Sequence, residues 1–176
     1  MEKEKEVKKV RAIVINEKGH ILVVRTNSNI YMLPGGKIDD GESNSQALKR
    51  EVLEEAGISL LEEKIEGPFF QTEYHGISVD ELTKQITRKH VNTQFYIAYT
   101  DLPIDKTKMK LSEREIARGQ RPYFMNISIL RYQIEQEETK PNNSERKKRY
   151  DKELLQILDK FKSYKIEKNK QISLER

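Results

Sequence analysis

The chain has 176 residues, of which 35% are hydrophobic and 35% are charged, and it contains no cysteine. This length suits a single domain with a sizeable core. The lack of cysteine excludes disulfides and thiolate metal sites, and it favours a reducing, cytoplasmic location. We expect neither a signal peptide nor a membrane partner, because no apolar run has the required length.

The net charge of +4 suits an anionic substrate, and part of the excess lies in the basic run 146–149. Such a run is usually a solvated helix face. We therefore expect a solvated face there and do not favour nucleic acid as a partner. A salt-sensitive RNA-binding arm is the alternative interpretation of the same charges.

The first half of the chain predicts strands followed by one helix. Residues 1–6 are expected to be a flexible N-terminus. Apolar patterning predicts strands at 7–15 and 21–25, joined as a hairpin, and a short strand at 30–33. A helix is predicted from Ser43 or Asn44 through Glu55, since Ser and Asn favour the N-cap and Gly57 suits the left-handed position after a helix end.

The second half predicts more strands and a final helix. We expect strands at 69–77 and 90–100, a short helix at 78–85 between them, a long polar connection at 101–122 and a weak strand at 123–134. A C-terminal amphipathic helix is predicted at about 144–165, followed by a flexible tail at 166–176. Its apolar stripe contains Leu154, Ile157, Leu158 and Phe161. The order predicts one α+β domain at 7–165, a mixed β-sheet between helices.

Three glutamates carry the chemistry. Glu51, Glu54 and Glu55 stand at i, i+3 and i+4 of the predicted helix, so their side chains share one face. Carboxylates this close repel one another unless a hard divalent cation binds them. Arg50 comes one residue earlier, so we expect it to point away from that face and to brace Glu42 in the preceding glycine loop.

The stretch 36–58 resembles the signature of the Nudix hydrolase family. Every specified position is filled, by Gly36, Glu42, Arg50, Glu51, Val52, Glu54, Glu55, Gly57 and Ile58. The resemblance is firm over this stretch and extends more loosely to about residue 135. It implies a Nudix-like αβα sandwich and a MutT-like hydrolase that cleaves the pyrophosphate bond of a nucleoside diphosphate linked to another group.

The resemblance also implies roles for individual residues. Glu51, Glu54 and Glu55, with the carbonyl of Gly36, would hold Mg²⁺, with Mn²⁺ as a substitute. These glutamates and Arg50 form the expected catalytic set. Glu54 is the preferred general base, and Glu113 or Glu115 in the long polar connection is the alternative.

Several points stay open in the sequence. A catalytically silent, nucleotide-sensing Nudix module and an RNA-processing pyrophosphohydrolase are the alternative functions. The leaving group and the base preference are undecided, and a homodimer is one option for the assembly. The three histidines show no metal-ligand spacing, which favours turn or surface roles. Most aromatic residues in the predicted strands are expected to be core, although several could stack a base: Tyr31, Phe69, Phe70, Tyr74, Phe95, Tyr123 and Phe124.

Overall fold

A computed structural model describes residues 4–79 and 83–175. Its centre is a seven-stranded mixed sheet in which β1 and β6 run parallel and the other paired strands antiparallel. The main path is β3-β2-β1-β6-β5, with β4 beside β1 and β7 beside β2. The strands are β1 (Lys5–Ile15), β2 (Ile21–Arg25), β3 (Tyr31–Met32), β4 (Gly35–Lys37), β5 (Ile65–Val79), β6 (Ile86–Tyr99) and β7 (Arg121–Met125).

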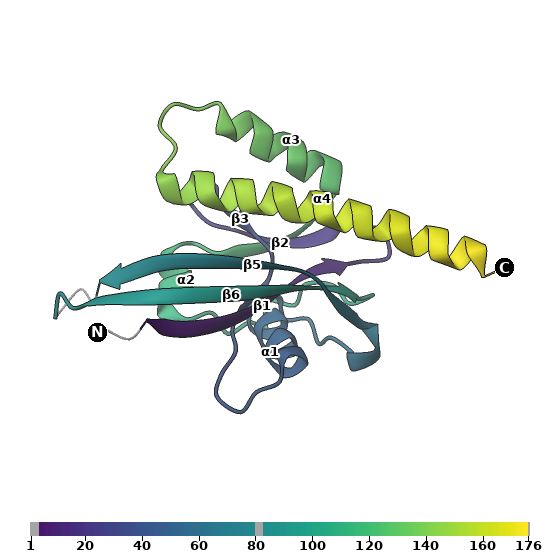
Figure 1. Ribbon diagram of the computed structural model, residues 1–176, viewed down its shortest axis with the longest axis horizontal. Helices are drawn as coiled ribbons and strands as arrows, with labels where there is room; N and C mark the ends of the chain where they lie inside the picture. Colours follow the sequence, from purple (N-terminus) through teal and green to yellow (C-terminus); the bar gives the residue numbers. More distant parts are fainter. Residues whose placement is uncertain (1–3, 80–82, 176) are drawn as a thin grey trace.

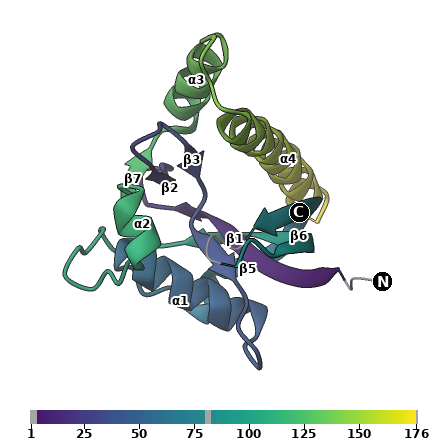
Figure 2. The ribbon, with the colours of Figure 1, turned by 90° about the vertical axis from the view of Figure 1, so that its left-hand side faces the viewer.

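Helices cover both faces of this sheet (Figures 1 and 2). One face packs against α1 (Asn44–Ala56), and the other against α3 (Ile127–Glu138) and α4 (Glu145–Leu174). Two short helices, η1 (Glu62–Lys64) and α2 (Glu113–Ala117), lie in the connections. Strand β1 supplies both cores, because alternate side chains point to opposite faces: Val10 and Ala12 pack towards α1, and Ile13 packs towards α4. The predicted αβα sandwich with a mixed sheet is confirmed.

Two predicted elements are wrong. Ser78 and Val79 belong to β5, and residues 83–85 are not helical, while 80–82 lie outside the described residues. The antiparallel ladder with β6 continues to the pair Val79 and Ile86, so Ser78 and Val79 pair across the strands instead of beginning the expected helix. The strand predicted at 123–134 ends at Met125, and α3 follows.

The start of α3 has a local cause. Asn126 caps the helix by accepting bonds from the backbone N–H groups of Ser128 and Ile129. Leu130 and Ile134, four residues apart, are then buried together in the core on the α4 face. Helical spacing of these two apolar residues therefore prevails over the weak alternation seen in the sequence.

The secondary structure extends beyond the expected domain bounds at both ends. Strand β1 already includes Lys5, which pairs in parallel register with Lys89 of β6. Helix α4 begins as expected after the N-cap Ser144, but it continues past residue 165 to Leu174 and projects beyond the sheet (Figure 1). Among the described residues, no helix combines the length and the apolar character needed to cross a membrane.

Candidate active site

Helix α1 is fixed at both ends and along one side. Ser43 and Gln46 form a reciprocal capping box at its start. At its end Gly57 adopts φ 69°, and its N–H donates to the carbonyl of Leu53. Between the caps Leu48 and Val52 are fully buried against the sheet. This anchoring sets the orientation of the glutamates on the rest of the helix.

Glu55 is the most enclosed of the three glutamates. Its side chain accepts a hydrogen bond of 2.8 Å from the backbone N–H of Gly35. Burial raises the pKa of Glu55 to about 8, against the opposing charge of Arg11. The negative charges of Glu51 and Glu115 also raise it. Burial in this position therefore disfavours the charged form of Glu55.

Glu51 and Glu54 lie nearer the surface. The Glu51 carboxylate sits against Gly36, so closely that a Cβ added to Gly36 would come within 2.4 Å of it. Burial raises the pKa of Glu51, and the charges of Glu54 and Glu115 act in the same direction. The Glu54 side chain is 37% exposed, whereas that of Glu51 is 13% exposed. Only glycine at position 36 leaves room for the Glu51 carboxylate.

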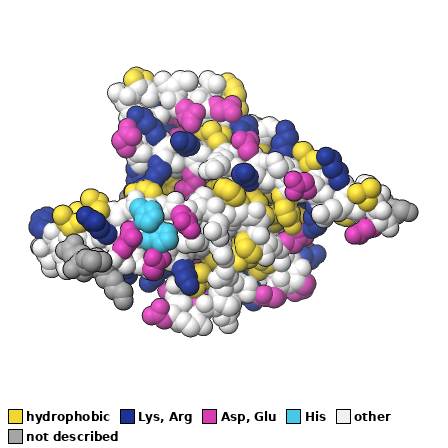
Figure 3. Space-filling model, in the orientation of Figure 1, with side chains coloured by type: hydrophobic (Ala, Val, Ile, Leu, Met, Phe, Trp, Pro, Cys, Tyr) yellow, Lys and Arg dark blue, Asp and Glu magenta, His cyan; other side chains and the backbone are white. Residues whose placement is uncertain are grey.

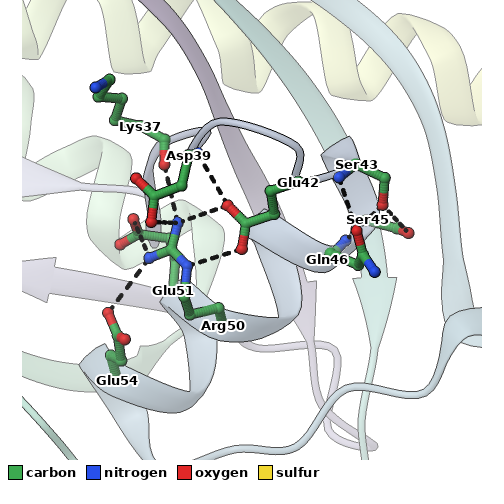
Figure 4. Close-up of polar contacts among 9 residues, drawn as sticks. All are labelled: Lys37, Asp39, Glu42, Ser43, Ser45, Gln46, Arg50, Glu51 and Glu54. Atoms are coloured by element: carbon green, nitrogen blue, oxygen red, sulfur yellow. Dashed lines mark hydrogen bonds and ion pairs between the residues drawn. The ribbon is translucent and has the colours of Figure 1, made fainter.

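Arg50 braces the glycine loop as predicted (Figure 4). Its Nε and Nη2 atoms donate to the two Glu42 oxygens at 2.8 and 2.9 Å, and Nη2 also donates to the carbonyl of Lys37 at 2.9 Å. This bidentate geometry is among the stronger ion-pair arrangements. The brace holds the loop 37–42 against the helix.

The expectation that Arg50 points away from the glutamate face is wrong. Its Nη1 atom lies 2.9 Å from Glu51 and 3.4 Å from Glu54 (Figure 4). A long side chain can swing across a quarter-turn of helix, which counting positions along the backbone does not capture. Arg50 thus provides the positive charge that the two carboxylates need in this structure.

The donor set suits a hard divalent cation. Glu51 and Glu54 both contact one nitrogen of Arg50, so a single positive group can be shared by their carboxylates. Carboxylate and carbonyl oxygens are the ligands that Mg²⁺ and Mn²⁺ prefer. In the described part of the chain, no three histidine, cysteine, aspartate or glutamate side chains are already gathered as a metal cluster. Each carboxylate has several lone pairs, so Glu51 and Glu54 can accept from Arg50 and still offer lone pairs to a cation.

The structure distinguishes between the two later glutamates. Both lie on α2, whose N-cap Ser112 forms a capping box with Glu115. Glu115 is half-buried, and its charge raises the pKa of both Glu51 and Glu55. Glu113 is exposed to solvent. Of the two, Glu115 is the one whose charge acts on the signature glutamates Glu51 and Glu55.

Arg11 is a neighbour of the site that the sequence did not single out. Its side chain donates to the carbonyl of Leu33 and packs against Gly35, the residue whose N–H binds Glu55. A signal was present, because Arg11 occupies a position on β1 where strand alternation points a side chain to the same face as the core residue Ile13. A charged residue at such a position indicates a polar cavity.

The solvated-face interpretation of the basic run is wrong for Lys147. The Lys147 side chain is 5% exposed and pairs at 2.7 Å with Asp151, whose side chain is 0% exposed. Lys147 also donates to the carbonyl of Asn29 in the loop before β3. The bond to Asn29 therefore joins the start of α4 to the loop before β3, whereas the neighbouring Lys148 is exposed.

Two histidines that are distant in sequence lie together on the surface. The rings of His75 and His90 stack across β5 and β6 with centroids 4.4 Å apart (Figure 3, cyan). A hydrogen bond that the Glu6 carboxylate accepts from His90 raises the pKa of His90, and the nearby Glu73 acts in the same direction, although desolvation opposes both. The predicted surface role fits His75, whose side chain is 65% exposed.

Known proteins show where this chain belongs. The crystal structure of a MutT protein from Methanosarcina mazei Go1 matches with a TM-score of 0.50 and 22% identity, covering 74% of this chain and 83% of that chain. A Bacillus subtilis (strain 168) protein named as an 8-oxo-dGTP diphosphatase is 46% identical over 68 residues. That match covers 36% of this chain and 46% of the relative, so it spans about half the relative's length. The NUDIX domain family matches residues 5–136, and the chain therefore belongs to the Nudix hydrolase family.

Proposed function

We propose that this protein is a Mg²⁺-dependent pyrophosphohydrolase that cleaves the pyrophosphate bond of a nucleoside diphosphate linked to another group. The observation that carries the proposal is the position of Glu51, Glu54 and Glu55 on the anchored helix α1, beside the glycines of the preceding loop. Mn²⁺ is the expected substitute because it accepts the same oxygen ligands.

The proposed roles follow from the environment of each side chain. Glu51 and Glu54, with the Gly36 carbonyl, would hold the metal, and Glu55 would join them after losing its proton. The cation would polarise the phosphoryl oxygens and lower the pKa of an attacking water. Glu54 is the preferred general base because it is the accessible member, and Glu115 is the alternative. Arg50 would keep the loop in place through Glu42.

Metal dependence tests this proposal directly. Purified protein treated with excess EDTA should lose its hydrolase activity and recover it on addition of Mg²⁺ or Mn²⁺. A substrate panel should include nucleoside triphosphates, ADP-ribose, dinucleoside polyphosphates and NADH, with released phosphate products as the readout. Full turnover in metal-free buffer, or no turnover of any member with either metal, would contradict the proposal.

The relative's name adds one substrate to that panel. Because the Bacillus subtilis protein is named for 8-oxo-dGTP, an oxidised deoxyguanosine triphosphate should be compared with its unmodified counterpart. The silent-module alternative is disfavoured because all of the signature glutamates are present. The RNA-processing alternative loses part of its support because Lys147 is buried in an ion pair. A cytoplasmic location and a homodimer stay predictions.

A further inference from the structure

A polar cavity lies on the α4 face of the sheet, away from the core that packs on α1. It has a volume of about 310 Å³ and is bordered by β1, β5, β6 and α4. Four basic side chains and two carboxylates line it, so its lining has a net positive charge: Lys9, Arg11, Arg149 and Lys152 oppose Glu73 and Glu153. The space-filling view shows Lys and Arg side chains along α4 above the histidine pair (Figure 3).

The cations of this cavity gather around one phenol. Tyr150 is half-buried at the cavity wall, and burial alone would raise its pKa. The charges of Arg11, Lys9 and Arg146 outweigh burial and lower the pKa of Tyr150. Burial and the neighbouring Arg11 likewise lower the pKa of Lys9. Positive charges this close repel one another, and a bound anion would relieve that repulsion.

The Arg149 side chain is positioned to bind such an anion. Its guanidinium lies 4.5 Å from the ring centroid of Tyr74 on β5 and 5.4 Å from that of Tyr150. Stacking on a ring restrains an arginine while its N–H groups stay free to donate in the plane of the guanidinium. In the ranges 4–79 and 83–175, Arg149 forms no ion pair with an acidic side chain. A planar fork of this kind matches phosphate oxygens.

The cavity is also linked to the signature glutamates. Arg11 lines the cavity and packs against Gly35, whose backbone N–H donates to Glu55. A ligand whose reacting pyrophosphate lies at the glutamates could therefore place further anionic groups near Arg11 and beyond it. Arg149 and Tyr150 belong to α4, which lies outside the residues 5–136 that match the family.

We propose that this cavity binds additional phosphate groups of a nucleoside polyphosphate, and that Arg149 of α4 is a specificity-determining residue that stacks on Tyr74 and binds them. The inference rests on the proposed function and narrows its substrate class. Substrates with a longer phosphate chain are preferred over nucleoside diphosphate sugars, which carry fewer negative charges.

The test measures binding without catalysis. Inorganic tripolyphosphate is titrated into the full chain by calorimetry, in EDTA and low salt, so that no metal bridges it to the glutamates. Arg149→Gln is compared with Lys148→Gln, a matched loss of one charge at the next position, where the side chain is exposed and pairs with Glu145. We expect Arg149→Gln to weaken binding about tenfold, or about 1.4 kcal/mol, and Lys148→Gln to change it less than about twofold.

The outcomes separate this inference from the proposed function. Absence of wild-type binding, or equal losses in both variants, overturns the cavity assignment even if hydrolysis is observed. Specific binding by a protein that hydrolyses nothing supports the cavity and contradicts the proposed function. Competition with adenosine triphosphate and with a short 5′-triphosphorylated RNA identifies the source of the phosphate chain. If neither adenosine triphosphate nor the RNA displaces tripolyphosphate, the assignment of the cavity as a phosphate-binding site is also overturned.

Discussion

At the scale of single residues, the three signature glutamates lie in different surroundings. Glu55 is enclosed and bonded to Gly35, Glu51 fills the space beside Gly36, and Glu54 keeps contact with solvent. A general base must exchange its proton with water during turnover, which favours the accessible group. A bound cation would favour the charged form of Glu55, because burial raises its pKa to about 8.

Substituting Glu54 by Gln should remove most of kcat and leave the fold intact. Glutamine keeps the shape and helix propensity but can neither bind metal strongly nor accept a proton. A thousandfold loss, the expected size, corresponds to about 4 kcal/mol of transition-state stabilisation. The measurement is kcat at saturating substrate and metal, with Glu63→Gln, an exposed glutamate outside the site, as the control. Retention of more than a tenth of wild-type kcat would exclude a central role for Glu54.

The sequence predicted contacts correctly where the residues are close neighbours along one helix or a short loop. The i, i+3, i+4 glutamates and the pairing of Arg50 with Glu42 follow from helix geometry and a short loop, and the structure has that pairing. The contacts of Arg50 with Glu51 and Glu54 depend on a rotamer. The position of Arg11 beside Gly35 depends on strand pairing between β1 and β4. Neither is encoded in local spacing.

At the scale of elements, the end of α1 depends on one glycine for two separate reasons. Gly57 has φ 69°, a left-handed conformation that disfavours other residues, and a Cβ there would come within 1.9 Å of the carbonyl oxygen of Asp105. Gly19 has a similar φ of 72° with no atom within 4 Å of the added Cβ. The two positions therefore separate backbone strain from steric clash.

Gly57→Ala should destabilise the protein more than Gly19→Ala does. We expect Gly19→Ala to lower the free energy of unfolding by about 1 kcal/mol, the usual cost of a left-handed conformation for a residue other than glycine. Gly57→Ala should lose more than about 2 kcal/mol, since the connection bonded to α1 through Asp105 and Ala56 must also move. Urea unfolding of both variants provides the comparison. Equal losses of unfolding free energy in the two variants would show that the connection moves away from residue 57 without an energetic cost.

Elements with strong local sequence features, such as caps and a clear apolar pattern, were predicted more accurately than the others. Helix α1 has a Ser cap, a buried apolar side and a glycine end, and its predicted extent was accurate. The hairpin of β5 and β6 has many exposed positions and weak alternation, so its length depends on the cross-strand ladder rather than on patterning. Helix α3 depends on Asn126 as a cap and on packing beneath α4, which a short window of sequence does not show.

At the scale of the whole molecule, α4 closes one face of the sheet through its apolar stripe. Leu154, Ile157, Leu158 and Phe161 are all buried in the core on that face. Leu158→Asp should therefore unfold the protein or lower the free energy of unfolding by more than about 3 kcal/mol, because it buries an unpaired charge. The control is Ile166→Asp, at a position on the same helix that is 47% exposed, where little change is expected. Thermal and urea unfolding followed by circular dichroism measure both, and similar stabilities of the two variants would mean that α4 does not contribute to the core.

The ion pair of Lys147 and Asp151 lies within α4, and its lysine also bonds to the carbonyl of Asn29 in the loop before β3. Neither member can be removed singly without a loss of stability. Lys147→Met leaves the fully buried Asp151 without its cation, and Asp151 Oδ1 already has no hydrogen-bond partner among the described residues. We expect a loss of about 3–5 kcal/mol for that single variant, the usual scale for breaking one side of a buried pair. The double variant Lys147→Met with Asp151→Leu should recover most of this loss, because apolar side chains of similar size remove both desolvation penalties.

Lys148→Met, at the exposed neighbouring position, is the matched control and should change the free energy of unfolding by less than about 0.5 kcal/mol. If the double variant were as unstable as the single one, the bond from Lys147 to the Asn29 carbonyl would be the contact that holds α4 in place.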